Sequence, residues 1–350
     1  MVGRLSVRLG QTLLVTWAIL TLLFLLTRTL LNEQELLARF GGMPGGAAPT
    51  ARQMQDARQQ ARHRLGFDIP LFYLSRQPYH PAQWLAARWH WNGTRNQYHR
   101  WLMQLGQGNL GESYRTQEPV AVLLGEALRH TVPLTLLAAT LLVLLSGMLG
   151  VLLAAVRRPA PLLAALFALD TLPLFVVALL LLLLLASPDF LPIFPVYGLG
   201  SDDAEASSLT YVSYLVLPVA SLVLTGIAEP TLQLATSLRH AMHQDYALTA
   251  RAKGLSRSQT LWRHALRNAA LPSLTLLTDL LPGLLAGSVI VELVFARPGM
   301  GRLLAEAAAA RDYPVLLGGA LVLAVVRQAS LWLADGLQRL LDPRLRAAST

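Results

Sequence analysis

The sequence lacks cysteine altogether and is short of charge. None of its 350 residues is cysteine, which excludes a disulfide framework, a thiolate nucleophile and a cysteine-bound metal centre. Charged residues make up 14% and apolar residues 54% of the chain, whereas soluble domains carry about 25% charged residues. Together with a mean hydropathy of +0.45, this composition indicates a polytopic membrane protein.

Lysine is almost absent as well. Lys253 is the only lysine among 29 basic residues. A Walker A loop needs Gly-Lys followed by Ser or Thr, but Lys253 stands between Ala252 and Gly254, so the chain has no ATP site of that type. The net charge of +9 comes from basic residues scattered along the chain. Nucleic-acid binding needs them gathered in one patch, and we therefore expect no nucleic-acid partner.

Six long apolar runs are present. A bilayer core about 30 Å thick needs about 20 apolar residues in a helix. The charge-poor runs of that length cover approximately residues 9–31, 131–156, 162–187, 211–234, 272–295 and 314–337. The first is interpreted as an anchor rather than a signal peptide, because no small-residue cleavage site follows it. We predict an all-α polytopic membrane protein with six transmembrane helices.

The distribution of arginine and lysine predicts the orientation. Thirteen of these residues lie in the short segments 1–8, 157–161, 235–271 and 338–350, against three in the opposite loops 188–210 and 296–313. Cytoplasmic loops are enriched in basic residues, so both termini are expected in the cytoplasm. The predicted organisation is a tip and first helix at 1–31, an outer segment at 32–130, a five-helix core at 131–341 and a cytoplasmic tail at 342–350.

The cytoplasmic loop between the fourth and fifth helices predicts a helix, a sharp turn and a second helix. From Asp245 it reads DYALTARAKGLSRSQTLWRHALRNAALP. Asp245 is expected to cap the first helix, and Gly254 to end it in the left-handed conformation. Ser256 is expected to cap the second helix, which would end near Asn268. Small alanines on the first helix would allow close approach to another surface.

This loop resembles the EAA loop of ABC-importer membrane permeases, in the dipeptide/oligopeptide/nickel branch. In that family the helix-turn-helix docks into a cleft of the cytoplasmic ATPase and transmits nucleotide-driven motion. The peptide branch reads close to DYxRTARAKGLS followed by RHALRNAxLP, and the match is nearly continuous. The resemblance implies an ATPase-coupling role for the matching residues Asp245, Tyr246, Ala250, Arg251, Ala252, Lys253, Gly254, Leu255, Ser256, His264, Arg267 and Asn268.

Further segments resemble the same family in the same order along the chain. They are RLGFDIPLFY (64–73), YHRWLMQLGQGNLGESYRTQEPV (98–120), VELVFARPGMGRLL (291–304), ARDYPVLLG (310–318) and LDPRLR (341–346). The resemblance implies the type I ABC importer permease fold, of the first-permease kind, with a long periplasmic segment between helices 1 and 2. It also implies a multi-pass protein of the bacterial inner membrane.

The resemblance implies partners and a cargo class. The expected partners are a second homologous permease, two cytoplasmic ABC ATPase subunits, a periplasmic substrate-binding protein and membrane lipid. ATP and Mg²⁺ would bind the ATPases, so this chain would hold no cofactor and would not be an enzyme. Di- or oligopeptides are the commonest cargo, but nickel, glycan and antimicrobial-peptide systems use similar permeases, so the substrate stays open.

Three carboxylates fall within the predicted spans. Charged side chains there are costly and often functional, so Glu229, Asp279 and Glu292 are candidates for the translocation path. The alternative is helix pairing or an interfacial position. A proton-coupled secondary transporter using Glu229 and Asp279 is the rival function, although such a carrier has no use for the cytoplasmic loop. No catalytic residues and no metal ligands can be named.

A tryptophan-rich piece lies between Tyr73 and Tyr98, outside the family resemblance. It contains Trp84, Trp89 and Trp91. Tryptophan and arginine anchor proteins at membrane interfaces, but this piece could equally dock a substrate-binding protein. Both interpretations stay open.

Overall fold

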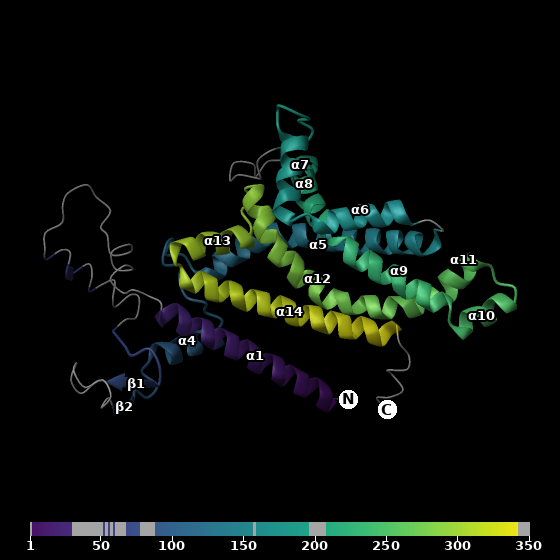
Figure 1. Cartoon of the computed structure of the whole chain (residues 1–350). Coiled ribbons are helices and arrows are strands. Elements are labelled where there is room, and N and C mark those ends of the chain that lie inside the picture. Colours follow the sequence, from purple (N-terminus) through teal and green to yellow (C-terminus); the bar gives the residue numbers. More distant parts are fainter. Residues whose placement is uncertain are drawn as a thin grey trace. The chain divides into compact units, whose positions relative to one another are not determined.

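The computed structural model describes residues 2–29, 68–77, 88–156, 159–195 and 208–341, with four further positions between 52 and 59. Most of the described residues are helical (Figure 1). The chain divides into two compact units. Unit 1 comprises residues 1–9, 124–306 and 322–350, and unit 2 comprises residues 10–123 and 307–321. Each unit is described by itself.

Unit 1 is a bundle of apolar helices. It contains all or most of α5 (Val120–Ala155), α6 (Ala160–Thr171), α7 (Leu174–Ala186), α8 (Ser208–Gly226), α9 (Ala228–Met242), α10 (Asp245–Ala252), α11 (Arg257–Thr260), the π-helical turn η3 (Leu261–Ala265), α12 (Leu266–Val294), α13 (Met300–Ala310) and α14 (Tyr313–Leu341). Helix α12 packs along α9, and α7 packs against α8 and α12. The buried core between them includes Leu134, Ala178, Leu222 and Val291.

Unit 2 combines most of α1 (Val2–Thr29) with a small outer subdomain. Strands β1 (Leu74–Gln77) and β2 (Arg88–Trp91) form an antiparallel hairpin. Helix α4 (Gln97–Gly106) follows, and the Asn96 side chain caps it by accepting a hydrogen bond from the His99 N–H at 2.7 Å. Phe24, Tyr98 and Leu317 form the buried centre of this unit.

Two of the described helices are single rods long and apolar enough to cross a membrane, α5 over Val120–Ala155 and α14 over Tyr313–Leu333. The number rises to four if the bent pairs α6–α7 and α8–α9 each count as one span. Helix α1 has a shorter apolar stretch, Leu14–Thr27. The predicted run 272–295 falls almost entirely within α12. Apolar side chains such as Leu144 and Met148 are more than 60% exposed on α5, which suits a lipid-facing surface.

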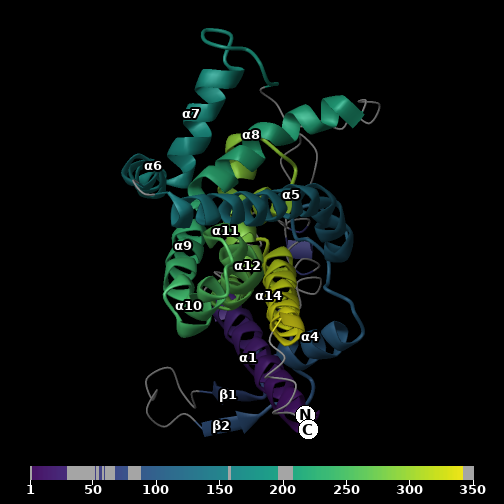
Figure 2. The same ribbon diagram turned by 90° about the vertical axis from the view of Figure 1, so that its right-hand side faces the viewer.

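The predicted span over 162–187 is broken into two helices. The structure places α6 and α7 there, and they meet at 101° (Figure 2). Pro173 explains the break, because the residue before a proline is driven out of the helical region and Leu172 has ψ 123°. The run 211–234 is also bent, by 45°, between α8 and α9.

Candidate functional site

The helix-turn-helix at 245–268 begins one residue earlier than expected. Gln244, with an extended backbone (φ −73°, ψ 155°), precedes the first residue of α10 and makes no side-chain cap. The prediction that Asp245 caps this helix is therefore wrong. Asp245 is instead its first helical residue, where a carboxylate is stabilised by the positive end of the helix. Gly254 has φ +89°, which confirms the predicted left-handed turn.

Ser256 caps the second helix, as predicted. Its Oγ accepts from the Gln259 N–H at 3.2 Å, while the Gln259 Oε1 accepts from the Ser256 N–H at 3.0 Å. The predicted end near Asn268 is wrong, since α11, η3 and α12 continue without a break to Val294. Pro272 lies inside α12 and does not end it, since a proline is tolerated inside a membrane helix.

One face of α10 is buried against this chain itself. Ala247 is fully buried and Ala250 is 6% exposed, and α10 contacts α9 and α11. The small alanines thus permit close packing within the chain, and Ala250 is not on the surface that a partner would meet. Leu255 and His264 are half-buried, and the Arg267 side chain lies outside the described residues. The other predicted coupling residues are exposed, namely Asp245, Tyr246, Arg251, Ala252, Lys253, Gly254, Ser256 and Asn268.

Two exposed apolar side chains on this surface were missed. Leu248 on α10 is 52% exposed and Trp262 in η3 is 61% exposed. Their signal in the sequence was a large apolar residue within the loop that is predicted to be cytoplasmic. Such residues mark contact surfaces, and π-helical turns occur frequently at functional sites. Tyr246 on α10 is also exposed, at 37%.

A cavity of about 610 Å³ lies within unit 1. Helices α5, α7, α8, α9 and α12 line it, and several glycines widen it, including Gly147, Gly226 and Gly283. Glu229 on α9 and Asp279 on α12 both line this cavity and both are exposed. The volume falls within the range of about 300–1,000 Å³ typical of small-molecule sites.

Asp170 of α6 was not singled out from the sequence, and it lines a neighbouring hollow together with Glu229. Helices α6 and α9 are in contact, so a third carboxylate reaches the same side of the bundle. Across the ranges that the structure describes, no group of three or more His, Asp or Glu side chains is arranged to hold a metal ion.

Glu292 has different surroundings from the other two candidates. It is 1% exposed and does not line the cavity. Its Oε1 accepts from the Thr131 hydroxyl at 2.6 Å, and its Oε2 accepts from the N–H groups of Gly301 at 2.7 Å and Arg302 at 3.1 Å. The Thr131 hydroxyl oxygen in turn accepts from the Met300 N–H at 2.8 Å. We call Glu292 and Thr131, with the backbone of 300–302, the Glu292 clasp.

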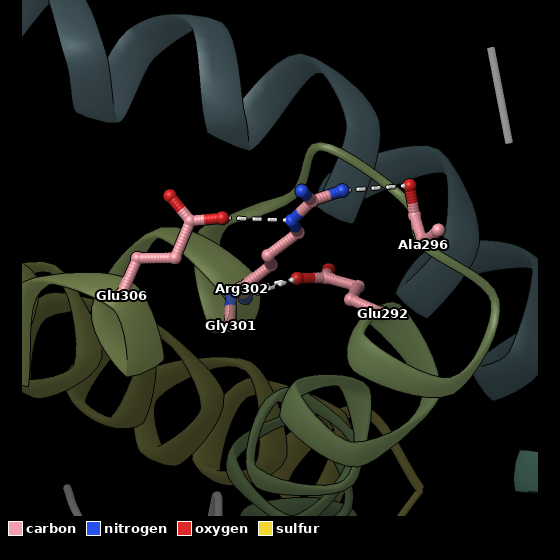
Figure 3. A network of polar contacts seen from close by, with 5 residues as sticks. All are labelled: Glu292, Ala296, Gly301, Arg302 and Glu306. Atoms are coloured by element: carbon pink, nitrogen blue, oxygen red, sulfur yellow. Dashed lines mark hydrogen bonds and ion pairs between the residues drawn. The ribbon is translucent and has the colours of Figure 1, made fainter. Parts of the chain in front are cut away.

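The Glu292 clasp joins α5, α12 and α13. The carboxylate lies at the first turn of α13, where free N–H groups and the helix dipole favour a negative charge. Figure 3 shows the hydrogen bond between the Gly301 backbone N–H and the Glu292 carboxylate. The Arg302 side chain donates to the Glu306 carboxylate at 2.8 Å and to the Ala296 carbonyl at 3.0 Å. Arg297, also 1% exposed, acts on Glu292 as a nearby positive charge.

Two glycines let the chain close over Glu292. A Cβ on Gly299 would collide with the Glu292 carboxyl group, and a Cβ on Gly301 would collide with the backbone of Val289. The segment VELVFARPGMGRLL noted in the sequence therefore has a physical basis. Its glutamate supplies the acceptor, and its glycines leave room for the backbone donors to reach it.

A second carboxylate joins distant segments in unit 2. Asp312 accepts hydrogen bonds from the Ser113 hydroxyl at 2.5 Å and the Tyr114 N–H at 3.0 Å. Gly111, two residues before Ser113, has φ +84°, a conformation that favours glycine. The segments NLGES and ARDYP, 199 positions apart at Ser113 and Asp312, are thus tied together by one side chain.

Comparison with known proteins gives one family. Residues 142–347 match the model of the binding-protein-dependent transport system inner membrane component. This matched region includes the helix-turn-helix, both cavity carboxylates and Glu292. The outer segment and the tryptophan-rich hairpin lie outside it.

Curated relatives extend the similarity over the remaining chain. The dipeptide transport system permease protein DppB of Lactococcus lactis is 29% identical over 97% of both chains. The oligopeptide transport system permease protein AppB of Bacillus subtilis is 33% identical over 71% of this chain and 79% of its own length. The metal-staphylopine import system permease protein CntB of Staphylococcus aureus is 32% identical, covering 71% and 77%.

Proposed function

Because this chain belongs to the binding-protein-dependent transport system inner membrane components, we propose that it translocates peptides as one permease subunit of an ABC importer. Its relatives are permease subunits and not enzymes, and ATP hydrolysis in such systems is carried out by separate ATPase subunits. The chain is accordingly an ABC importer permease of the inner membrane.

Di- or oligopeptides are the proposed cargo. Two of the relatives named above are dipeptide and oligopeptide permeases, and the one that matches 97% of both chains is a dipeptide permease. A peptide carries an ammonium group, and the cavity presents the carboxylates Glu229 and Asp279. Opposite charges at a cavity wall suit each other.

The observation that carries the coupling proposal is the position of the helix-turn-helix. It directly connects α9, which carries Glu229, to α12, which carries Asp279. These two helices pack along each other and converge on α10 and α11 (Figure 1). A displacement of α10 by the ATPase would therefore move both helices that carry the cavity carboxylates. Such a movement can shift the equilibrium between outward-open and inward-open states.

The proposed topology has six membrane spans and both termini in the cytoplasm, with residues 32–130 in the periplasm. The proposed partners are a second homologous permease, two cytoplasmic ABC ATPases and a periplasmic substrate-binding protein. ATP and Mg²⁺ belong to the ATPases, and this chain needs no cofactor of its own. The cavity would then form one wall of a path completed by the second permease.

Leu248→Asp tests the coupling proposal. Leu248 is half exposed, so the fold should tolerate the change, while a charge forced into an apolar docking cleft costs several kcal/mol. The assembled importer should lose substrate-stimulated ATP hydrolysis by about tenfold or more, which corresponds to 1.4 kcal/mol or more. The matched control is Val156→Asp, at an apolar residue that directly follows α5 and is 40% exposed; this variant should keep the stimulation. Full stimulation in Leu248→Asp would refute docking through α10.

The proton-coupled carrier finds no support in the family match. It would use Glu229 and Asp279 as proton sites and would leave the helix-turn-helix without a role. The two functions differ in their energy source, which is directly measurable.

A further inference from the structure

The hairpin in unit 2 has one strongly apolar face. In the β1–β2 register, Leu74 lies opposite Trp91 and Arg76 lies opposite Trp89. Since alternate residues of a strand point to opposite faces, Leu74, Trp89 and Trp91 share one face, and Ser75 and His90 lie on the other. Leu74, Trp89 and Trp91 are 48%, 71% and 64% exposed. We call this surface the Trp face.

A chain of aromatic rings connects the Trp face to α1. Trp91 stacks on Tyr73 with ring centroids 5.7 Å apart. Tyr73 contacts Tyr98 at 6.0 Å, and Tyr98 contacts Phe24 of α1 at 5.5 Å. The Tyr98 hydroxyl also hydrogen bonds to the Thr21 hydroxyl at 2.8 Å. The hairpin is therefore held against α1 by packed aromatic rings.

The hairpin base is fixed by polar contacts as well. The Asn92 backbone N–H donates to the Tyr73 carbonyl at 2.8 Å, and its side chain donates to the Phe72 carbonyl at 2.9 Å. The Tyr73 hydroxyl hydrogen bonds to the His99 ring at 2.9 Å. These contacts consequently fix the position of the Trp face along the axis of α1.

This position along α1 lies near the surface of the bilayer in the proposed topology. Between positions 14 and 27 the exposed side chains of α1 are apolar, including Leu14, Leu22 and Leu26, as a lipid-facing helix requires. Phe24 precedes the last helical residue, Thr29, by five positions, which corresponds to about 8 Å along the axis. In the proposed topology this end of α1 faces the periplasm, so the hairpin lies beside the outer headgroup layer.

The charge of this region fits an anionic surface. From position 69 to 111 the sequence contains no aspartate or glutamate, but it contains Arg76, Arg88, Arg95 and Arg100. Each arginine near an anionic membrane surface contributes about 1 kcal/mol, and tryptophan concentrates at the headgroup level.

We propose that the Trp face binds the lipid headgroup layer of the outer leaflet, with arginines of the 69–111 segment on anionic lipid phosphates. The hairpin then acts as a second membrane contact that orients the outer segment next to α1. The inference rests on the proposed topology, in which α1 spans the membrane, but not on peptide transport or on ATPase coupling.

The cysteine-free chain allows single labelled positions to test this. Trp89→Cys and His90→Cys, adjacent residues on opposite faces of β2, are each labelled with an environment-sensitive fluorophore in the full chain. The protein is reconstituted in vesicles containing phosphatidylglycerol, without a binding protein. The label at position 89 should be quenched by lipid-borne nitroxide and be severalfold less accessible to iodide than the label at position 90. In phosphatidylcholine vesicles the shielding at position 89 should weaken.

Several outcomes would overturn the proposal. Equal iodide access at positions 89 and 90 would show that the Trp face is in water. Shielding of position 89 only after adding the periplasmic binding protein would assign the surface to that protein instead. Leu22→Cys, on the exposed face of α1, reports separately on the topology. Iodide access at position 22 would refute the membrane placement of α1, whereas a shielded position 22 with an accessible position 89 would refute the lipid contact alone.

Discussion

The carboxylates of the apolar helices in unit 1 lie in two contrasting regions. Glu292 is 1% exposed and accepts three hydrogen bonds, from Thr131, Gly301 and Arg302. Glu229 and Asp279 are exposed on the wall of a cavity, and no hydrogen bond links either side chain to another residue that the structure describes. Buried polar groups with every bond satisfied hold a structure together, whereas unpaired charges beside a cavity are available to a ligand.

This contrast separates residues that share the same sequence signal. All three are acidic residues in apolar runs, and only their surroundings distinguish a structural role from a transport role. We therefore expect changes in the Glu292 clasp mainly to reduce stability, and changes at the cavity to alter transport with little effect on stability. A path role for Glu292 stays a prediction that its burial does not favour.

Glu292→Ala should have the largest effect. It removes the acceptor group of two backbone donors and a hydroxyl, and it takes away the nearby negative charge that interacts with the buried Arg297. Each buried hydrogen-bonding group left without a partner costs about 1–3 kcal/mol. After heating in detergent, the monodisperse fraction measured by size-exclusion chromatography should fall at a lower temperature for the variant than for the wild type. A variant that is as stable as wild type but inactive in transport would place Glu292 in the transport path. Glu292 would then not differ in role from Glu229 and Asp279.

Gly301→Ala should have the next largest effect. The added methyl group collides with the backbone of Val289, and overpacking of this kind costs about 1–3 kcal/mol. Gly125→Ala on α5 is the matched control, because a Cβ there meets no atom within 4 Å. The same heating assay should show a lower melting temperature for Gly301→Ala and an unchanged or higher one for the control. Equal melting temperatures would mean that the loop does not close tightly on Glu292.

Asp279→Asn and Glu229→Gln should change stability least. Both side chains are exposed, so the free energy of unfolding should change by less than about 0.5 kcal/mol. Loss of one carboxylate from the cavity should raise the KM for uptake of a peptide with a free ammonium group by roughly threefold to tenfold, or up to about 1.4 kcal/mol. An N-acetylated peptide should show a smaller change. Destabilised variants with an unchanged KM would assign these carboxylates to helix packing.

Local turn chemistry was predictable from the sequence because it depends on few neighbouring atoms. Gly254 adopts the left-handed conformation and Ser256 forms its cap, as their residue types required. The N-cap is Gln244 rather than the predicted Asp245. The residue types alone do not show which of two adjacent positions is the cap, because that depends on where the backbone becomes helical. The break at Pro173 was missed because an apolar run looks the same whether straight or bent by 101°.

Long-range pairings were beyond the sequence because nothing local signals them. Glu292 meets Thr131 across 161 positions, and Glu229 shares a cavity wall with Asp279 only through the packing of α9 on α12. The family resemblance located the helix-turn-helix, but the burial of Ala250 and the exposure of Leu248 depend on how α10 rests on its own chain.

Peptide uptake into vesicles tests the central claim most directly. The chain is reconstituted with a second permease, two ATPases and a binding protein, and uptake of a labelled dipeptide is measured with either ATP or an inward proton gradient as the energy source. We expect uptake that requires ATP and the binding protein, is lost in Leu248→Asp, and does not depend on the proton gradient. Uptake driven by the proton gradient without ATP, and abolished in Glu229→Gln or Asp279→Asn, would contradict it.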